Sequence, residues 1–302
     1  MSRLSGTQHY YRHCRVDLMT EYTICESLAS IDSPYMVALA RREPYGRIIG
    51  EFLEEQGMLR NGCSLCEVGG GYGSLMKGLL ESCGHRIGRV CMVDLSLSLL
   101  ARQRAVLAPW QRRILYVNAD VMTQIPALVN VDTLILNEVI GDLDTWEDLD
   151  AKSLPDEASR LIDRYDLEIP GDRLFNFNIG AIRLVEEICR KRLPAFISEH
   201  SCDCIVPKDM EYLLRGLESS GFPRKISLTG HSEFTIRFSH LIRVAEYWGR
   251  TVRTGSLAEL VGIRHTPRMN FIFTAGACGT DEQEIIYELL DNIREYRWLL
   301  IG

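Results

Sequence analysis

The sequence lacks the apolar runs that place a protein in or across a membrane. No stretch of its 302 residues approaches the roughly 18 consecutive apolar residues that a membrane-spanning helix needs. The first 25 residues also lack the apolar central segment of a secretory signal. We therefore expect a soluble protein with a cytoplasmic location and no membrane partner.

Signals for disulfides and for nucleic-acid binding are also missing. The ten cysteines are scattered without regular spacing, which predicts reduced and mostly buried thiols. Lys and Arg number 34 against 41 Asp and Glu, which gives a net charge of −7, and there is no dense basic run. Such a surface does not favour contact with phosphate backbones, so we expect no nucleic-acid partner.

The composition is that of an ordinary globular protein. Hydrophobic residues make up 46% of the chain and charged residues 25%, with 24 glycines and 10 prolines. These values exclude disordered, collagen-like and coiled-coil chains. At roughly 100–200 residues per domain, the length predicts one large domain or one domain with an appendage.

Hydrophobic periodicity predicts an α/β fold. The first 60 residues look helical, with an apolar stripe from Ile48 to Leu53 that ends at Gly57. Short apolar runs then alternate with helical stretches, which predicts parallel strands joined by crossover helices on both faces of a sheet. We expect a doubly wound, Rossmann-like arrangement. The five predicted strands are residues 64–68, 89–94, 114–118, 132–137 and 195–200.

The same pattern suggests how the chain is divided. We expect an N-terminal helical cap over residues 1–60 and a core over residues 61–302. A charged, helix-like segment at about 144–172 predicts a helical insertion after the fourth strand. The remaining predicted elements are a helix near 179–185, a helix at about 208–220, the apolar run 233–238, a helix ending at 249, the apolar run 271–276 and a last helix over 281–298.

The most informative motif is EVGGGYGSL, which begins at Glu67 where the first strand passes into the first crossover helix. Gly69, Gly71 and Gly73 permit positive φ angles and let a ligand lie against bare backbone. The dinucleotide fingerprint requires its third glycine at the position of Ser74. The motif therefore predicts a nucleotide-like ligand held without the pyrophosphate pattern, with an ordinary strand-to-helix turn as the alternative.

Three acidic residues at the ends of the first three strands suit one ligand. Glu67 would repel a pyrophosphate but attract the amino group of an amino acid. Asp94 is placed to bind both ribose hydroxyls of an adenosine, unless it caps the next helix, a role that Ser96 could equally fill. Asp120 is placed for the exocyclic amine of adenine. S-adenosylmethionine carries all of these groups and no phosphate, so we expect it as the cofactor.

These motifs resemble the class I S-adenosylmethionine-dependent methyltransferases, whose Glu/Asp-x-Gly-x-Gly-x-Gly turn matches residues 67–73. Within that class the chain resembles the MidA-like group, which includes a mitochondrial complex I assembly factor. The group usually continues with Ala-Leu-Pro after the aspartate that matches Asp142, whereas this chain has Leu-Asp-Thr. The resemblance to the group rests on residues 67–76, 93–107, 134–143 and, more loosely, 230–241.

The resemblance also implies which residues do the chemistry. Asn137 and Glu138 end the fourth strand, where this fold opens toward its ligand crevice. Members of the group with an assigned activity methylate a protein arginine, and a guanidinium needs carboxylates that orient it and accept its proton. We expect Glu138, Asn137 and Asp142 as catalytic residues, against the alternative of a solvated acidic loop. The expected cofactor-binding residues are Glu67, Gly69, Gly71, Gly73, Asp94, Leu95, Asp120, Val121 and Asn137.

Other motifs favour no further activity. No Asn-Pro-Pro-aromatic tetrapeptide follows the fourth strand, which disfavours methylation of an exocyclic base nitrogen. His200, Cys202 and Cys204, with His231 further on, match no standard zinc-site spacing, so we expect no metal. The C-x-x-C that begins at Cys63 is interpreted as buried packing.

Three functional hypotheses follow from these patterns. The preferred one is methyl transfer to a protein side chain, with arginine as the acceptor. The second is methylation of a small metabolite, which a deep closed pocket over Glu138 would favour. The third is a cofactor-binding assembly factor without turnover, which would be favoured if Asn137 and Glu138 faced away from the cofactor. The oligomeric state is left open.

Overall fold

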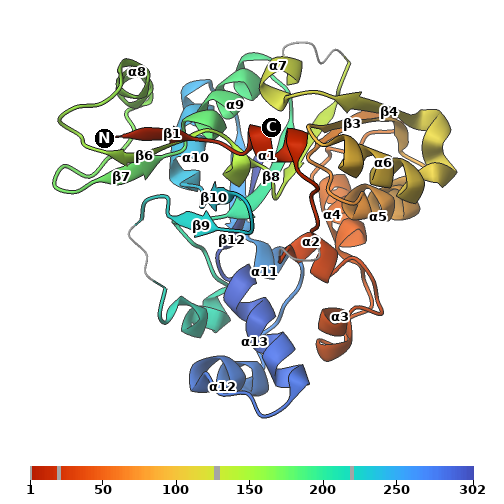
Figure 1. The fold of residues 1–302 in the computed structure, drawn as a ribbon. Helices are drawn as coiled ribbons and strands as arrows, with labels where there is room; N and C mark the ends of the chain where they lie inside the picture. Colours follow the sequence, from red (N-terminus) through yellow and green to blue (C-terminus); the bar gives the residue numbers. More distant parts are fainter. Residues whose placement is uncertain (1, 19–21, 126–129, 218–220) are drawn as a thin grey trace.

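The computed structural model describes the chain except for residues 1, 19–21, 126–129 and 218–220, and its centre is a seven-stranded sheet (Figure 1). The four pairs from β8 to β4 are parallel, whereas β12 runs antiparallel to both of its neighbours. The predicted α/β fold is confirmed. In spatial order the strands are β11 (Val252–Ser256), β12 (Tyr296–Ile301), β8 (Ala195–His200), β5 (Thr133–Asn137), β2 (Cys63–Val68), β3 (Ile87–Asp94) and β4 (Ile114–Asn118).

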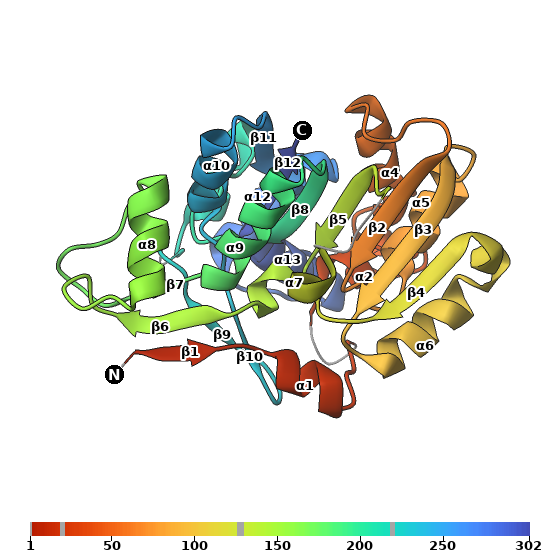
Figure 2. The ribbon, with the colours of Figure 1, turned by 90° about the horizontal axis from the view of Figure 1, so that it is seen from above.

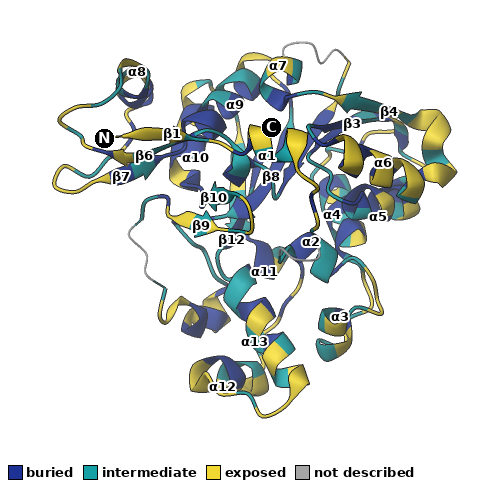
Figure 3. Cartoon of the chain, viewed as in Figure 1, coloured by how far each residue is buried: buried dark blue, intermediate teal, exposed yellow. Residues whose placement is uncertain are grey.

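Helices cover both faces of the sheet (Figure 2). Alternate residues of a strand point to opposite faces, so Leu65 of β2 joins one hydrophobic core and Cys66 and Val68 join the other. Burial on both faces is expected where helices form the crossovers, and the central strands β5 and β8 are mostly buried (Figure 3). The first core is covered by α4 (Tyr45–Glu55) and α5 (Ser74–Cys83), and the second by α8 (Asp156–Tyr165), α9 (Ile179–Arg190) and α10 (Phe238–Tyr247).

Further helices complete the two layers. α6 (Leu97–Val106) follows β3, and α7 (Val121–Gln124) follows β4. Five more helices add side chains to the first core: α2 (Ile24–Ser27), α3 (Pro34–Ala38), α11 (Leu257–Leu260), α12 (Pro267–Ala275) and α13 (Asp281–Ile293).

The N-terminal segment contains a strand as well as helices. β1 (Arg3–Ser5) pairs antiparallel with β6 (Thr145–Leu149), which also pairs with β7 (Phe175–Phe177). α1 (Gln8–His13) follows β1, and Figure 2 shows this segment running along one edge of the molecule. The cap boundary at residue 60 stays a prediction, and α4 shares the core of the sheet.

The predicted helical insertion at 144–172 is wrong in its first part. β6 occupies Thr145–Leu149, and the helix α8 begins only at Asp156. The strand forms because β1, about 140 residues earlier in the chain, and β7 supply its backbone partners. A strand whose partner lies so far away leaves little local signal.

The predicted last helix over 281–298 is also wrong at its end. α13 stops at Ile293, and the Tyr-Arg-Trp-Leu-Leu-Ile segment that follows forms β12 between β8 and β11. Aromatic and branched apolar residues suit a buried strand. The helical periodicity of α13 made the residues after it look helical as well, so the change to a strand was not predicted.

Two other segments differ from their predicted form. Residues 208–214 make a 3-10 helix, η4 (Lys208–Leu214), that is interrupted at Met210, and residues 218–220 of that predicted helix lie outside the described part. The run 233–238 gives only the short β10 (Ser232–Phe234), which pairs with β9 (Lys225–Ser227). The run 271–276 lies largely in α12.

The thiols agree with the prediction from the sequence. The ten cysteines all lie in the described part of the chain, none of them forms a disulfide, and six are buried. Cys66 is one of the buried six and lies directly beside Cys91 on the neighbouring strand, which supports a packing role for the C-x-x-C motif. Within the described residues, no helix combines the length and apolar character needed to cross a membrane. The cytoplasmic location stays a prediction.

Two glycines allow α4 and α5 to cross at close range. A Cβ on Gly46 would lie 2.5 Å from the carbonyl oxygen of Leu75. A Cβ on Gly78 would lie 2.8 Å from the Cα of Gly46. Real Cβ atoms do not approach backbone this closely, so the two helices would have to move apart.

We predict that Gly78→Ala lowers the free energy of unfolding by about 1–3 kcal/mol, because the added methyl overpacks the crossing. Urea unfolding followed by circular dichroism measures this change. Gly171→Ala is the matched control, since a Cβ there meets no atom within 4 Å. Unchanged stability of Gly78→Ala would show that the crossing relaxes freely.

Candidate active site

A pocket opens at the carboxyl ends of β2, β3, β4 and β5, which is where doubly wound sheets bind ligands. Its walls come from the turns after these strands and from the N-terminal segment between Thr7 and Glu26. Every residue predicted for the cofactor or for catalysis lines this pocket except Gly73. The structure thus brings together residues that the sequence separates by as many as 75 positions, from Glu67 to Asp142.

The glycine-rich turn follows β2 and forms the floor of the pocket. Gly69, Gly71 and Gly73 have φ angles of +63°, +51° and +89°, which is the left-handed region that glycine favours. A Cβ on Gly69 would lie 2.5 Å from Cγ2 of Val139. Gly73 is the N-cap of α5 instead of a lining residue. Its role is therefore to turn the chain into the helix.

Glu67 ends in an unsatisfied carboxylate. Its side chain is buried, and Oε2 accepts no hydrogen bond. Burial, with smaller contributions from Asp94 and Glu26, raises the pKa of Glu67 to about 8. A buried carboxyl group without a partner is costly. Its position in the pocket suits a cationic group of a ligand.

Asp94 is fixed in place by two donors. The backbone N–H of Ser96 donates to Oδ1 at 2.9 Å, and Nε2 of Gln103 donates to Oδ2 at 2.9 Å. Gln103 also donates to the carbonyl oxygen of Gly71 at 3.0 Å, so it ties the acid to the glycine turn. Burial raises the pKa of Asp94 to about 6. The N-cap of α6 is Ser96, which leaves Asp94 facing the pocket.

Asp120 combines a structural role with its place in the pocket. It is the N-cap of α7 and accepts a 2.8 Å hydrogen bond from the backbone N–H of Met122 at Oδ1. Its Oδ2 lies 3.8 Å from a guanidinium nitrogen of Arg12 in α1. Leu95 and Val121 line the pocket on either side of this acid.

Asn137 and Glu138 stand at the end of β5, beside the glycine turn. The hydroxyl of Tyr45 donates to Oδ1 of Asn137 at 2.6 Å. Glu138 has a φ of +53°, an uncommon conformation for a residue with a side chain. Such strain is often found at functional sites because it aims a side chain that would otherwise point elsewhere.

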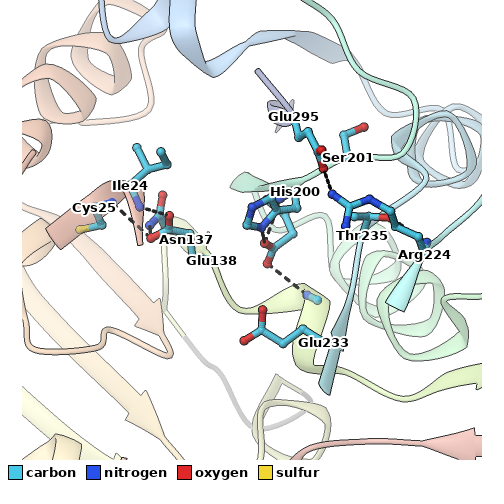
Figure 4. Close-up of polar contacts among 12 residues, drawn as sticks. Ile24, Cys25, Asn137, Glu138, His200, Ser201, Arg224, Glu233, Thr235 and Glu295 are labelled. Carbon is cyan, nitrogen blue, oxygen red and sulfur yellow. Dashed lines mark hydrogen bonds and ion pairs between the residues drawn. The ribbon is translucent and has the colours of Figure 1, made fainter. Parts of the chain in front are cut away.

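The carboxylate of Glu138 is held by the N-terminus of α2 (Figure 4). The backbone N–H groups of Ile24 and Cys25 donate to its two oxygens at 2.7 and 3.3 Å. Burial and the nearby Glu199 raise the pKa of Glu138 to about 7, although these donors oppose the shift. Glu138 is therefore a fixed part of the pocket wall and does not lie in a solvated loop.

Asp142 lies one turn beyond Glu138, at the end of the 3-10 helix η3 (Ile140–Asp142). Burial, with a contribution from Glu233, raises its pKa well above the ordinary range. Glu199 of β8 fixes η3 because its Oε2 accepts a hydrogen bond from the backbone N–H of Gly141 at 3.1 Å. This places Asp142 at the outer edge of the pocket.

Sequence reasoning missed the contribution of the N-terminal segment. Thr7, Gln8 and Tyr11 from the start of the chain and Thr23, Cys25 and Glu26 from α2 all line the pocket. Glu26 is also tied to the turn, since its Oε2 accepts a 2.8 Å hydrogen bond from Ser74. The helical pattern of residues 1–60 carried no signal for this placement.

The pocket fits the groups of S-adenosylmethionine. The orphaned oxygen of Glu67 suits the ammonium of its amino-acid part. The fixed carboxylate of Asp94 suits a pair of ribose hydroxyls. The absent Cβ at Gly69 and Gly71 lets a ligand approach the backbone.

Comparison with known families supports the same ligand. Residues 45–143 match a family model described as "Putative S-adenosyl-L-methionine-dependent methyltransferase". The matched region runs from α4 through the glycine turn, Asp94, Asp120 and Glu138 to just past Asp142. No curated protein matches the chain.

Solved structures share the fold. An uncharacterized protein from Burkholderia thailandensis superposes with a TM-score of 0.55 at 17% identity, over 99% of this chain and 87% of that one. A second structure from the same organism, bound to S-adenosylhomocysteine, has a TM-score of 0.49 at 17% identity, over 89% of this chain and 76% of that one.

The family match and the pocket agree on the class of enzyme. The chain is an S-adenosylmethionine-dependent methyltransferase, and S-adenosylmethionine is its cofactor.

We predict that Asp94→Ala weakens binding of S-adenosylhomocysteine by at least about tenfold, because a charged hydrogen-bond acceptor contributes about 1.5–3 kcal/mol. Isothermal titration calorimetry measures the affinity. Asp32→Ala is the control, since Asp32 is exposed and lies outside the pocket. If a folded Asp94→Ala protein binds as tightly as the parent, Asp94 does not hold the ribose.

A second prediction concerns pH. The free protein holds Glu67 mostly protonated below its pKa of about 8, and only the carboxylate can pair with an ammonium. Affinity for S-adenosylhomocysteine should therefore rise from about pH 6.5 to about pH 8, by at most roughly tenfold per unit. Glu67→Gln should remove most of this rise.

Methylthioadenosine is the matched ligand control for Glu67, because it keeps the nucleoside and lacks the amino-acid part. Its affinity should change little over the same pH range. An equal rise for both ligands would assign the titration to Asp94 or another group near the nucleoside.

Proposed function

We propose that the methyl acceptor is a guanidinium nitrogen of a protein arginine, and that the chain is a MidA-like enzyme. The observation that carries this proposal is a gathering of acids on the acceptor side of the pocket. Burial raises the pKa of both Glu138 and Asp142; Glu199 adds to the shift of Glu138, and Glu233 and, less, Glu199 add to that of Asp142. Buried carboxyl groups that repel one another are stabilised by a cation. An arginine side chain supplies that cation with a fork that matches carboxylates.

Methyl transfer is an in-line displacement, so the protein mainly has to hold the acceptor close and correctly aligned. S-adenosylmethionine supplies the methyl group on a positively charged sulfur. Glu138 would orient the acceptor nitrogen and receive its proton, and a pKa of about 7 suits a base that works near neutral pH. Asn137, fixed by Tyr45, would complete this wall.

The segments that resemble the MidA-like group support the proposal by their location. Residues 134–143 run through β5 and η3, and residues 230–241 run through β10 into α10. β10 packs on η3, so the two segments meet beside Asp142. These segments border the acceptor side of the pocket as well as the cofactor side.

A small cationic metabolite is the second candidate acceptor. It is favoured by the N-terminal segment, which places Tyr11, Leu18 and Thr23 on the pocket wall and anchors α2 on Glu138. A covered pocket excludes a bulky protein partner more readily than a free amino acid. The third hypothesis, a factor without turnover, is disfavoured because Asn137 and Glu138 both line the pocket.

Methylation assays with labelled S-adenosylmethionine separate these functions. The substrates are an arginine-containing peptide, the same peptide with lysine in place of arginine, and free arginine. Methylation of the first alone, located on the guanidinium by mass spectrometry, supports the proposal. Methylation of free arginine alone supports the small-metabolite function, and labelling of lysine contradicts the guanidinium assignment.

We predict that Glu138→Gln lowers turnover of a cationic acceptor by about one to three orders of magnitude, the scale of a lost general base. Affinity for S-adenosylhomocysteine should change less than about threefold. In the parent, kcat/KM should rise with pH through a midpoint near pH 7 and level off about one pH unit above it, because Glu138 must be ionised, and the variant should lose this limb.

The matched control is Asp148→Asn, which removes an exposed acid from the same acidic stretch. It should keep parental turnover. If Glu138→Gln loses cofactor affinity as strongly as turnover, the role of Glu138 is to hold α2 over the cofactor. Unchanged turnover in both variants would show that the carboxylate of Glu138 takes no part in catalysis.

A further inference from the structure

Three side chains from two distant parts of the chain meet at the outer edge of the pocket. They are Asp142 at the end of η3, His231 in the turn between β9 and β10, and Glu233 in β10. Nε2 of His231 lies 3.9 Å from Oδ1 of Asp142 and 3.4 Å from Oε1 of Glu233. The three ligand atoms all lie within 4.8 Å of one another.

The group is shielded from water. The side chains of His231, Asp142 and Glu233 are 3%, 13% and 21% exposed. Oδ1 of Asp142, which faces the imidazole, is buried and accepts no hydrogen bond. Negative charge on these two shielded carboxyl groups is costly unless a cation offsets it.

The distances are close to those of a metal site. Two ligands bound to a tetrahedral ion at about 2.1 Å are about 3.4 Å apart. The separation of His231 and Glu233 equals this value, and that of His231 and Asp142 exceeds it by about 0.5 Å. A small rotation of the Asp142 carboxylate would close the difference. One position or more would remain for water.

We propose that Asp142, His231 and Glu233 bind a divalent first-row metal ion, through one imidazole nitrogen and two carboxylate oxygens. This set of ligands suits Mn²⁺, Fe²⁺, Co²⁺ or Zn²⁺ better than the all-oxygen preference of Mg²⁺ or Ca²⁺. With Asp142 and Glu233 on the ion, Glu138 is left to orient the methyl acceptor, and the ligand set itself requires no particular acceptor. The competing arrangement is a protonated His231 that pairs with both acids without a metal.

The same ion would join three elements around the pocket. Tyr10 of α1 stacks on His231, with ring centroids 4.1 Å apart and planes at 18°. Thr7 donates through Oγ1 to the backbone carbonyl of Asp142 at 3.0 Å. Thr7, Gln8 and Tyr11 line the cofactor pocket. An ion on this cluster would therefore hold η3, the β9–β10 hairpin and α1 together over the cofactor.

This site differs from the cysteine-histidine set weighed on sequence grounds. His200, Cys202 and Cys204 do not form a ligand cluster among the residues that the structure describes. The expectation of no metal rested on the lack of a short ligand spacing, and Asp142 is brought to His231 only by the packing of β10 on η3.

Titration of Mn²⁺ into the chelator-treated full chain, followed by electron paramagnetic resonance, tests the proposal. One equivalent should bind. His231→Gln and Glu233→Gln should each weaken binding by at least about tenfold, since losing a ligand should cost no less than losing a group that orients one. His85→Gln and Glu284→Gln alter an exposed histidine and an exposed glutamate elsewhere and should bind as the parent does.

Co²⁺ identifies the ligands. Nitrogen and oxygen ligation gives d–d bands without a thiolate-to-cobalt charge-transfer band. Such a band, lost in Cys202→Ser/Cys204→Ser, would overturn the proposal. The absence of stoichiometric binding of Mn²⁺, Co²⁺ and Zn²⁺ would also overturn the proposal. In that case the competing arrangement, in which a protonated His231 pairs with both acids, would explain the cluster. Binding that both His231→Gln and Glu233→Gln leave unchanged would contradict the proposal as well.

Coupling to the cofactor provides a readout besides metal affinity. Because the ion would order α1, S-adenosylhomocysteine should bind more tightly with Mn²⁺ present, and Mn²⁺ more tightly with S-adenosylhomocysteine present, by the same factor. His231→Gln should abolish the difference. If S-adenosylhomocysteine binds equally well with and without bound Mn²⁺, the ion does not hold α1 over the pocket.

Discussion

The desolvation of acidic side chains at one edge of the sheet is the constraint on which this molecule depends. Glu67 and Asp94 lie at the ends of β2 and β3, Glu138 and Asp142 follow β5, and burial raises the pKa of every one of them. A fold keeps such groups only when ligands or donors offset the cost. In the proposed function, the four acids divide between a cofactor side, with Glu67 and Asp94, and an acceptor side, with Glu138 and Asp142.

The N-terminal segment offsets part of the cost of burying these acids. The N–H groups at the start of α2 satisfy Glu138, and Thr7 and Tyr10 pack on Asp142 and His231. The segment therefore both lines the pocket and stabilises part of its negative charge. This links cofactor binding, acceptor binding and the placement of α1 and α2, since each changes the environment of the same carboxyl groups.

Much of the cofactor side could be predicted from the sequence because its residues are local to strand ends. The turn from Glu67 to Gly73 and the acids Asp94 and Asp120 follow strands that periodicity reveals, and parallel strands bring their ends together. Glu138 and Asp142 were predictable as candidates for the same reason. Glu199 and the residues of the N-terminal segment were not, because their roles arise from contacts between elements far apart in sequence.

The sequence by itself determined the α/β class, the parallel crossovers between the central strands and the chemistry of the cofactor turn, because alternation, glycine spacing and strand-end acids are local patterns. Only the tertiary structure decided that β1 completes β6, that residues 296–301 form β12, and that His231 and Glu233 meet Asp142. Each of these depends on a distant partner that supplies backbone pairing or charge. Local pattern cannot specify such a partner, because the free energy of the contact belongs to both segments together.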